Sequence, residues 1–235
     1  MTRLDGAKTM LKSIVLAGVL LGAASGVALA DEGIMPAPEG WGGYYAGLNG
    51  GYAQGTLTDG NKTFPDVTLT GAFVGGQAGY NFVLIGGLVA GIQGDVDWSF
   101  EKGSYGGPGV TIGAFDNATL TDTVKWTGAV TGRVGFAVGP VMAYGLGGFA
   151  VLGNTLQNLG VDQLQGKSPI ESNITQTHYG WTAGGGLSAM VGQASAFLEY
   201  RYSSYGKADY SLAVGSAPVS LVDQQVRVGL NYHMQ

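Results

Sequence analysis

Two carboxylates two residues apart, Asp95 and Asp97, are the first candidates for chemistry in this sequence. In an extended strand both would point to the same side, and glycosidases place a pair of carboxylates beside the bond that they cleave. Other charged residues fall on the polar side of further alternating segments: Arg133, Glu199, Arg201 and Arg227. What these six charges can do depends on the space that their strands leave around them.

Residue types for nucleophilic or metal chemistry are scarce. Cysteine is absent, which excludes disulfides, thiol nucleophiles, thiolate metal sites and a lipidated cysteine. The two histidines, His178 and His233, are too few for a zinc site. His178 with a nearby serine and acid could serve a lipid acyl-hydrolase or acyltransferase, but no Ser-His-acid spacing singles itself out, and a histidine next to a loop is usually polar surface. We expect no catalytic, metal-binding or cofactor-binding residue.

The N-terminus has the layout of a secretory signal. Positive residues precede an uncharged run over 13–30 that ends on Ala28-Leu29-Ala30, so cleavage is predicted after Ala30. The strongly apolar part, 14–21, is far shorter than the roughly 20 residues that a spanning helix needs. The sequence predicts a signal peptide over 1–30, a short polar segment over 31–42 and one domain over 43–235.

The composition is that of a membrane protein without spanning helices. Charged residues make up 11% of the chain, well below the roughly 25% of soluble domains. Glycine occurs 44 times, and no long apolar run follows the signal. The net charge of -5 argues against a nucleic-acid partner. A transmembrane β-barrel fits, because its apolar residues occupy only every second position.

Apolar and polar residues alternate in eight segments, 44–52, 69–81, 88–100, 123–138, 141–154, 175–191, 194–205 and 218–233. Long polar links, 56–68, 102–121, 156–174 and 206–217, alternate with short ones such as Gly139-Pro140. This pattern predicts an all-β fold, an eight-stranded antiparallel transmembrane up-and-down β-barrel. The apolar set, which includes Tyr144 and Leu146, would face lipid and the polar set the lumen. A soluble sandwich with these aromatics in its core is the alternative.

Aromatic residues cluster near the expected strand ends, where they would form girdles at the two membrane interfaces. The predicted girdle residues are Trp41, Tyr44, Tyr52, Tyr80, Trp98, Trp126, Phe136, Trp181, Tyr202 and Tyr232.

An eight-stranded barrel has an interior just wide enough for side chains to fill it, which leaves no room for a sugar. Charges held there must be paired, because an unpaired one costs several kcal/mol. The six charges, Asp95, Asp97, Arg133, Glu199, Arg201 and Arg227, therefore predict a salt-bridged plug, with a polar track for ions or small solutes as the alternative.

Three stretches, 41–52, 131–136 and 226–232, resemble the first, fourth and last strands of the small porin-like outer-membrane proteins of alphaproteobacteria, often called outer-membrane immunogenic proteins. That family is similar in fold to opacity proteins and to the membrane domain of OmpA-type proteins. The resemblance implies an abundant surface protein that supports envelope integrity, with porin activity assigned to some members. Family members usually end on an aromatic residue, whereas here Tyr232 is followed by three more residues.

We therefore expect a structural barrel in the bacterial outer membrane whose loops meet the outside. A narrow solute channel is the alternative, and a lipid-modifying enzyme or an adhesin is a weaker one. The expected partners are outer-membrane lipid and lipopolysaccharide, the barrel-assembly machinery during biogenesis and an unidentified surface or host ligand. The protein is expected to be a monomer without cofactors.

Overall fold

The computed structural model describes residues 40–59, 67–106, 115–162, 170–212 and 215–234. The predicted signal peptide over 1–30 and residues 31–39 of the predicted polar segment lie outside these ranges. Among the described residues, no helix is long and apolar enough to cross a membrane.

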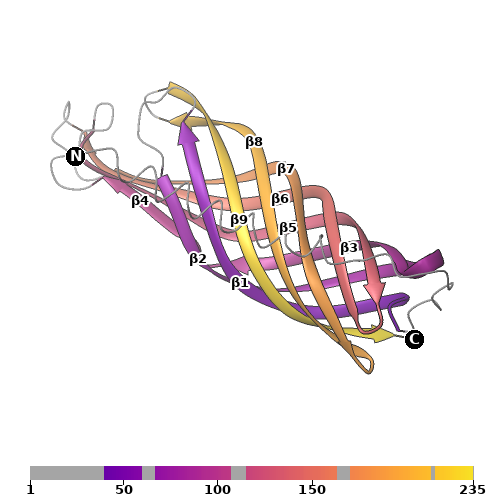
Figure 1. The fold of residues 1–235 in the computed structure, drawn as a ribbon. Coiled ribbons are helices and arrows are strands. Elements are labelled where there is room, and N and C mark those ends of the chain that lie inside the picture. Colours follow the sequence, from indigo (N-terminus) through magenta and orange to yellow (C-terminus); the bar gives the residue numbers. More distant parts are fainter. Residues whose placement is uncertain (1–39, 60–66, 107–114, 163–169, 213–214, 235) are drawn as a thin grey trace, which may run out of the picture. The chain divides into compact units, whose positions relative to one another are not determined.

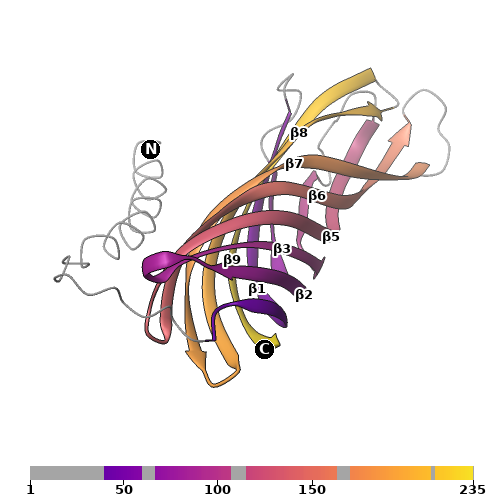
Figure 2. The same ribbon diagram turned by 90° about the vertical axis from the view of Figure 1, so that its right-hand side faces the viewer.

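The described chain forms one closed antiparallel barrel (Figures 1 and 2). Its elements are β1 (Gly43–Asp59), β2 (Val67–Val83), the 3-10 turn η1 (Ile85–Gly87), β3 (Leu88–Ser99), β4 (Lys102–Gly106), β5 (Phe115–Val138), β6 (Val141–Asp162), β7 (Ile170–Val191), β8 (Ala194–Leu212) and β9 (Gly215–Met234). Both β3 and β4 pair with β2 and β5, so β4 continues β3 after a break. Strand β1 pairs with both β2 and β9, which closes the barrel. The predicted eight-stranded fold is confirmed.

One end of the barrel carries the short connections. Gly139-Pro140 joins β5 to β6, and Gly192-Gln193 joins β7 to β8. Both glycines have a positive φ, 57° and 64°, which residues with a Cβ rarely adopt. The start of β1 and the end of β9 meet at the same end, where Tyr44 pairs with Met234. In outer-membrane barrels this short-turn end is the periplasmic one.

At the other end the strands are longer than predicted. Within the expected loops 56–68, 102–121, 156–174 and 206–217, strands include residues 56–59, 67–68, 102–106, 115–121, 156–162, 170–174, 206–212 and 215–217. Beyond the membrane the outer side of a strand meets water: in β2, Thr68 and Thr70 are exposed while Val67 and Leu69 are buried inside. The lipid-facing alternation therefore ends while backbone pairing continues. Polar composition was therefore a poor guide to where these strands end.

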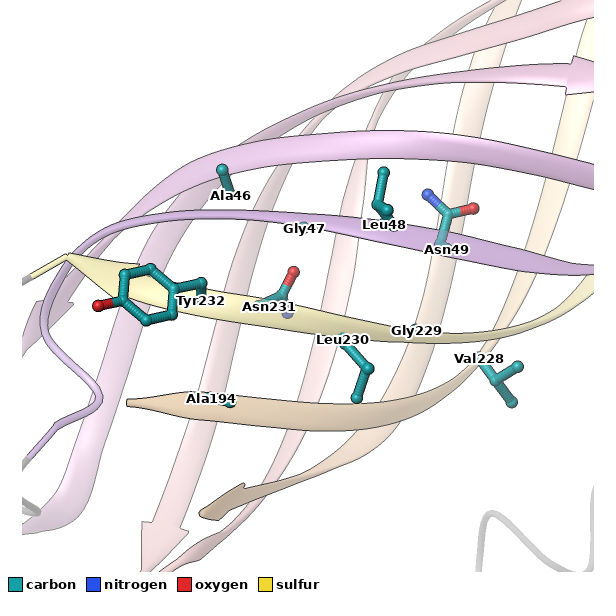
Figure 3. Close-up of a pocket in the computed structure, with 10 residues that line it drawn as sticks. All are labelled: Ala46, Gly47, Leu48, Asn49, Ala194, Val228, Gly229, Leu230, Asn231 and Tyr232. Carbon is teal, nitrogen blue, oxygen red and sulfur yellow. The ribbon is translucent and has the colours of Figure 1, made fainter. Parts of the chain in front are cut away.

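Exposed apolar side chains cover the outer surface, as expected of a lipid-facing wall. The seam between β1, β9 and β8 bears a shallow groove of about 380 Å³ (Figure 3). The groove is bordered by the exposed side chains of Leu48, Val228, Leu230 and Tyr232. Its lining also includes the small side chains of Ala46 and Ala194. No charged side chain lines this groove, and its exposed large side chains are apolar or aromatic, as expected of a surface that meets lipid.

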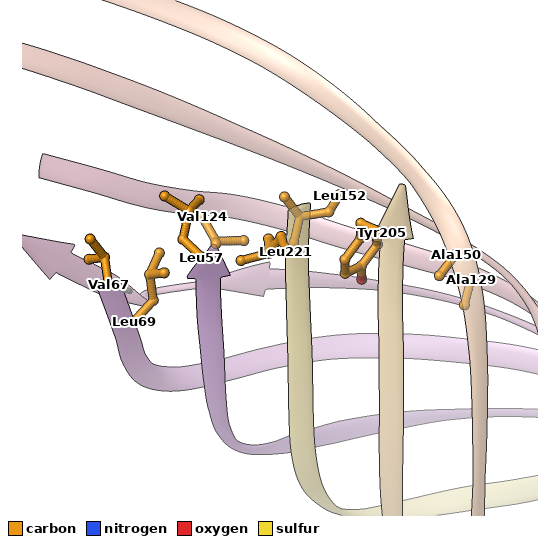
Figure 4. Packing of buried hydrophobic residues seen from close by; sticks show 9 residues of the cluster. All are labelled: Leu57, Val67, Leu69, Val124, Ala129, Ala150, Leu152, Tyr205 and Leu221. Atoms are coloured by element: carbon orange, nitrogen blue, oxygen red, sulfur yellow. The ribbon is translucent and has the colours of Figure 1, made fainter. Parts of the chain in front are cut away.

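Two apolar clusters fill the interior toward either end. The turn-side cluster consists of Trp41, Val89, Ala137, Met142, Tyr144 and Leu146. The loop-side cluster consists of Leu57, Val67, Leu69, Val124, Ala129, Ala150, Leu152, Tyr205 and Leu221 (Figure 4). Assigning Tyr144 and Leu146 to the lipid face was wrong, because both are at most 9% exposed and point inward. Their strand carries glycines on both faces, which hides the alternation.

Candidate functional site

The charged side chains gather inside the barrel. Asp95 and Asp97 come from β3, Glu199 and Arg201 from β8, and Arg227 from β9. Each pair shares a side of its strand because strand side chains alternate. All five are buried, and we call them the ionic cluster.

Within the ionic cluster, Arg201 joins two carboxylates. Its Nη1 lies 2.9 Å from Asp95 Oδ1, and its Nη2 lies 2.8 Å from Glu199 Oε1. Tyr144 adds a hydrogen bond by donating its hydroxyl to Glu199 Oε2 at 2.9 Å. Arg201 therefore ties β8 to β3 across the interior.

Arg227 contacts all three carboxylates. It binds Asp97 with both terminal nitrogens, Nη1 to Oδ2 at 2.8 Å and Nη2 to Oδ1 at 3.2 Å. It also lies 3.8 Å from Asp95 and 3.7 Å from Glu199. Bidentate charged pairs of this kind are strong and rigid. A carboxylate pair held so by arginines is not available as the acid and base of a glycosidase.

Arg133 is buried with the others but is held differently. No ion pair joins its guanidinium to a carboxylate of the described residues within 4.0 Å. Its Cζ lies 5.0 Å from the ring centres of both Tyr45 and Tyr144, and its Nη1 donates to Gln93 Oε1 at 3.4 Å. The expectation that Arg133 is salt-bridged was wrong, because two aromatic faces take the place of a carboxylate.

Polar side chains and a small cavity lie beside the ionic cluster. A chain of amides from three neighbouring strands lies on the inner wall, from Asn49 of β1 through Gln77 of β2 to Asn231 of β9, with both hydrogen bonds at 2.6 Å. A cavity of about 10 Å³ borders Asp95, Arg201 and Arg227, which is room for about one water molecule.

Three further buried carboxylates were missed from the sequence: Glu101, Asp122 and Asp223. Glu101 follows Phe100, between β3 and β4, and it continues the alternation of β3: Ser99 and Glu101 are buried, while Trp98 and Phe100 are exposed. Ser99 donates its hydroxyl to Glu101 Oε1 at 2.7 Å. Burial, reinforced by the negative charges of Asp223 and Asp122, raises the pKa of Glu101 to about 8. Glu101 lies one residue past the predicted segment 88–100, and extending the alternation of Asp95 and Asp97 would have placed it inside.

Trp41 was wrongly assigned to the aromatic girdle. Its side chain is fully buried, and its indole N–H donates to the Gly139 carbonyl oxygen at 3.2 Å. The ring lies edge-on to His233, with 6.0 Å between the ring centres. Trp41 precedes β1, so no strand alternation fixed its direction, and it turns into the barrel beneath the short turns.

The other predicted girdle residues lie on the outer surface or are partly buried there. Near the turn side, Tyr44 contacts Tyr80 with ring centres 4.7 Å apart. Near the loop side, Trp181 contacts Tyr202 at 5.6 Å. The remaining members are Tyr52, Trp98, Trp126, Phe136 and Tyr232, all exposed.

Neither histidine forms a hydrolytic triad. His178 is 2% exposed rather than on the polar surface, and its side chain hydrogen-bonds to the backbone of Gly206. His233 Nε2 lies 3.0 Å from Ser195 Oγ, but among the described residues none hydrogen-bonds to its Nδ1, where a triad needs an acid. The described residues contain no group of three or more His, Asp or Glu side chains that could hold a metal ion.

Sequence comparison finds relatives that are named outer-membrane proteins, and the alignments cover most of this chain. The 25 kDa outer-membrane immunogenic protein of Brucella abortus is 34% identical over 237 residues, covering 94% of this chain and 98% of that protein. The 31 kDa outer-membrane immunogenic protein of Brucella melitensis is 35% identical and covers 82% and 83%. The 22 kDa outer membrane protein of Rhizobium leguminosarum is 30% identical and covers 81% and 76%. No family model matches the chain.

The likeness to solved structures is low. Neisserial surface protein A is 16% identical with a TM-score of 0.39, covering 81% of this chain and 97% of that one. Ail of Yersinia pestis is 14% identical with a TM-score of 0.40, covering 81% and 99%. The outer membrane protease OmpT of Escherichia coli is 8% identical with a TM-score of 0.41, covering 88% and 100%. The placement among outer-membrane proteins rests on the sequence relatives.

Proposed function

Because this chain belongs to the outer-membrane immunogenic proteins, we propose that it is a structural barrel of the outer membrane that supports envelope integrity and conducts no solutes. The carrying observation is the filled interior, in which an ionic cluster lies between two apolar clusters. The cavity beside the buried charges has room for about one water molecule, which supports a barrel without a path for solutes.

The role proposed is mechanical. Arg201 and Arg227 tie β8 and β9 to β3 across the interior, and Trp41 ties the segment before β1 to the turn between β5 and β6. Cross-links of this kind oppose the flattening and opening of a barrel, whose strand edges the hydrocarbon would not tolerate. The loop end is then the part that meets partners outside the cell.

An enzymatic role receives no support from the histidines. His178 is engaged with a backbone group, and the Ser195–His233 pair is buried without an acid. A nucleophile also needs substrate access, which a side chain 1% exposed inside the barrel does not have.

Single-channel recording tests the conductance part of the proposal. Purified, folded wild-type protein in planar bilayers should give no current steps above those of protein-free membranes. Arg227→Gln should also give none, because both apolar clusters remain. Regular steps in the wild type that Arg227→Gln alters would overturn the filled-barrel proposal in favour of a narrow channel.

A deletion strain tests the envelope part. Loss of the gene should raise sensitivity to detergent and increase leakage of periplasmic protein, and the wild-type chain should reverse both. His178→Ala should reverse them equally well if no histidine chemistry is involved. A deletion with an intact barrier but altered lipopolysaccharide acylation would instead favour a lipid-modifying enzyme.

A further inference from the structure

The backbone pairing between β7 and β8 stops before either strand ends. Its last pair is Gly180 with Tyr205. Strand β7 nevertheless extends back to Ile170, paired with β6, and β8 extends to Leu212, paired with β9. Figure 1 shows the two strands diverging at this end of the barrel. A seam in the barrel wall therefore opens on the loop side.

His178 marks the point where the seam opens. Its side chain, 2% exposed, hydrogen-bonds to the backbone of Gly206, one residue past the last pair. Farther out, over 170–177, no strand of the described chain pairs with the β8-facing side of β7. We call the backbone of these eight residues the open edge.

The direction of the backbone groups in the open edge follows from one hydrogen bond. The Met190 N–H donates to the Pro140 carbonyl oxygen at 2.7 Å, so the backbone of Met190 faces β6. The β6–β7 register runs unbroken from there to Ile170, and backbone groups alternate sides along an antiparallel strand. Even-numbered residues thus bond to β6, and the N–H and C=O groups of Glu171, Asn173, Thr175 and Thr177 face the open edge.

The two sides of the seam differ in how well they would accept a new strand. Proteins block strand edges with bulges, lysine and proline. The β8 side has a register shift between Tyr205 and Ala208, and Lys207 lies within it. The open edge of β7 has an unbroken register, and its sequence over 170–177 contains neither lysine nor proline. Thr175 and Thr177, residues typical of strands, are exposed on its outer side.

We propose that the open edge of β7 binds an extended segment of another protein outside the cell, which adds as a strand in the place that β8 leaves. Backbone hydrogen bonds to the odd-numbered residues would supply the affinity, so that the partner's side chains matter little. The neighbouring connections, 163–169 and 213–214, are seven and two residues long and already join paired strands, which favours a segment from another protein. The inference rests on the proposed function only in placing the loop end outside.

Peptide binding to the folded barrel tests this proposal. The probe is a fluorescent nine-residue peptide of alternating threonine and valine with a lysine at each end, and binding is followed by anisotropy. The control peptide has the same sequence and charge but carries N-methyl groups on alternate residues, which removes backbone donors. We expect saturable binding of the first peptide and at least tenfold weaker binding of the second. Equal binding of both, or no binding of either, would overturn the proposal.

Substitutions at Thr177 place the binding on the open edge. Thr177→Pro removes an N–H that faces the open edge and leaves the bonds to β6, so the barrel should still fold and binding should fall at least tenfold. Thr177→Val changes the side chain, keeps the N–H and should bind like the wild type. Thr175→Pro repeats the test if Thr177→Pro does not fold. Unchanged binding by the folded proline variant refutes the assignment.

A second copy of the chain is the competing occupant. Light scattering should show a monomeric barrel in detergent both for the wild type and for Thr177→Pro. A wild-type dimer that the proline variant dissolves would assign the open edge to self-association and overturn the proposal. The channel and envelope assays use no peptide, so their failure is distinguishable from failure here.

Discussion

The buried arginines differ in how much their replacement should destabilise the barrel, because they have different partners. Arg227→Gln strands the buried Asp97 without its bidentate partner, and we expect the free energy of unfolding to fall by about 3–5 kcal/mol. Arg133→Gln removes contacts with two aromatic rings and should cost about 1–2 kcal/mol. Urea titration of folded protein in detergent measures both losses.

The double variant Asp97→Asn with Arg227→Gln is the control, since it removes both charges and should recover much of the loss. Equal losses for Arg227→Gln and Arg133→Gln would contradict the distinction between an ion-paired and a ring-held arginine.

Glu101 should make stability depend on pH. Its pKa is raised from the usual 4.5 to about 8, so between these values the unfolded chain ionises while the folded barrel keeps the proton. The unfolded state is therefore increasingly favoured as pH rises from about 5 to about 8, and the loss is complete above pH 8. Glu101→Gln should match the wild type near pH 5 and exceed it at pH 9 in urea midpoint. An equal difference at both pH values would show that ionisation of Glu101 is not the cause.

Sequence reasoning at this scale worked where a residue lies inside a regular strand. Alternation placed Asp95, Asp97 and Arg227 on the inner side because each has several patterned neighbours. It failed for Trp41, which precedes the first strand. Glu101 was missed although it continues the alternation of Asp95 and Asp97, because the predicted segment ended at residue 100. The partner of Arg133 could not be predicted either, since choosing between a carboxylate and two rings needs the distances across the barrel.

At the scale of elements, the packing of β5 against β6 depends on a particular glycine. A Cβ on Gly148 would lie 2.1 Å from the Val130 carbonyl oxygen, whereas one on Gly132 of the neighbouring strand would meet nothing closer than 3.9 Å. Gly148→Ala must therefore displace backbone, and we expect a loss of about 1–3 kcal/mol in the same urea titration. Gly132→Ala is the matched control and should stay within about 0.5 kcal/mol of the wild type. Equal tolerance of both would contradict the close approach.

The limits of the elements were harder to predict than their number. All eight alternating segments became strands because one side faces lipid and the other a packed interior. Their outer ends could not be located, since in water a strand needs only its backbone partners. In β6, which is rich in glycine, the side of the strand that faces the interior could not be predicted either. Glycines occur on both sides of this strand, so no polar side marked the inward direction of Tyr144 and Leu146.

For the molecule as a whole, Trp41 links parts of the chain that are far apart in sequence. It contacts His233 near the end of β9 and donates to Gly139, 98 residues away. Trp41→Ala should lower the free energy of unfolding by about 3–5 kcal/mol, as expected for truncation of a buried aromatic residue. Trp41→Phe keeps a ring and loses the hydrogen bond, so it should cost about 1 kcal/mol. The temperature at which the folded electrophoretic band disappears should rank them wild type, Phe, then Ala.

The ionic cluster also bears on the order in which this barrel can be completed. Asp95 and Asp97 are neutralised by Arg201 and Arg227, which follow them by 106 and 130 residues. Contacts of such sequence separation form late, because a long stretch of chain must first be brought together. A chain still lacking β9 leaves Asp97 without Arg227, so the final strand completes charge neutralisation and barrel closure in one event. We therefore expect closure to be cooperative, because the pairing of β9 with β1 and β8 and the neutralisation of Asp97 occur together.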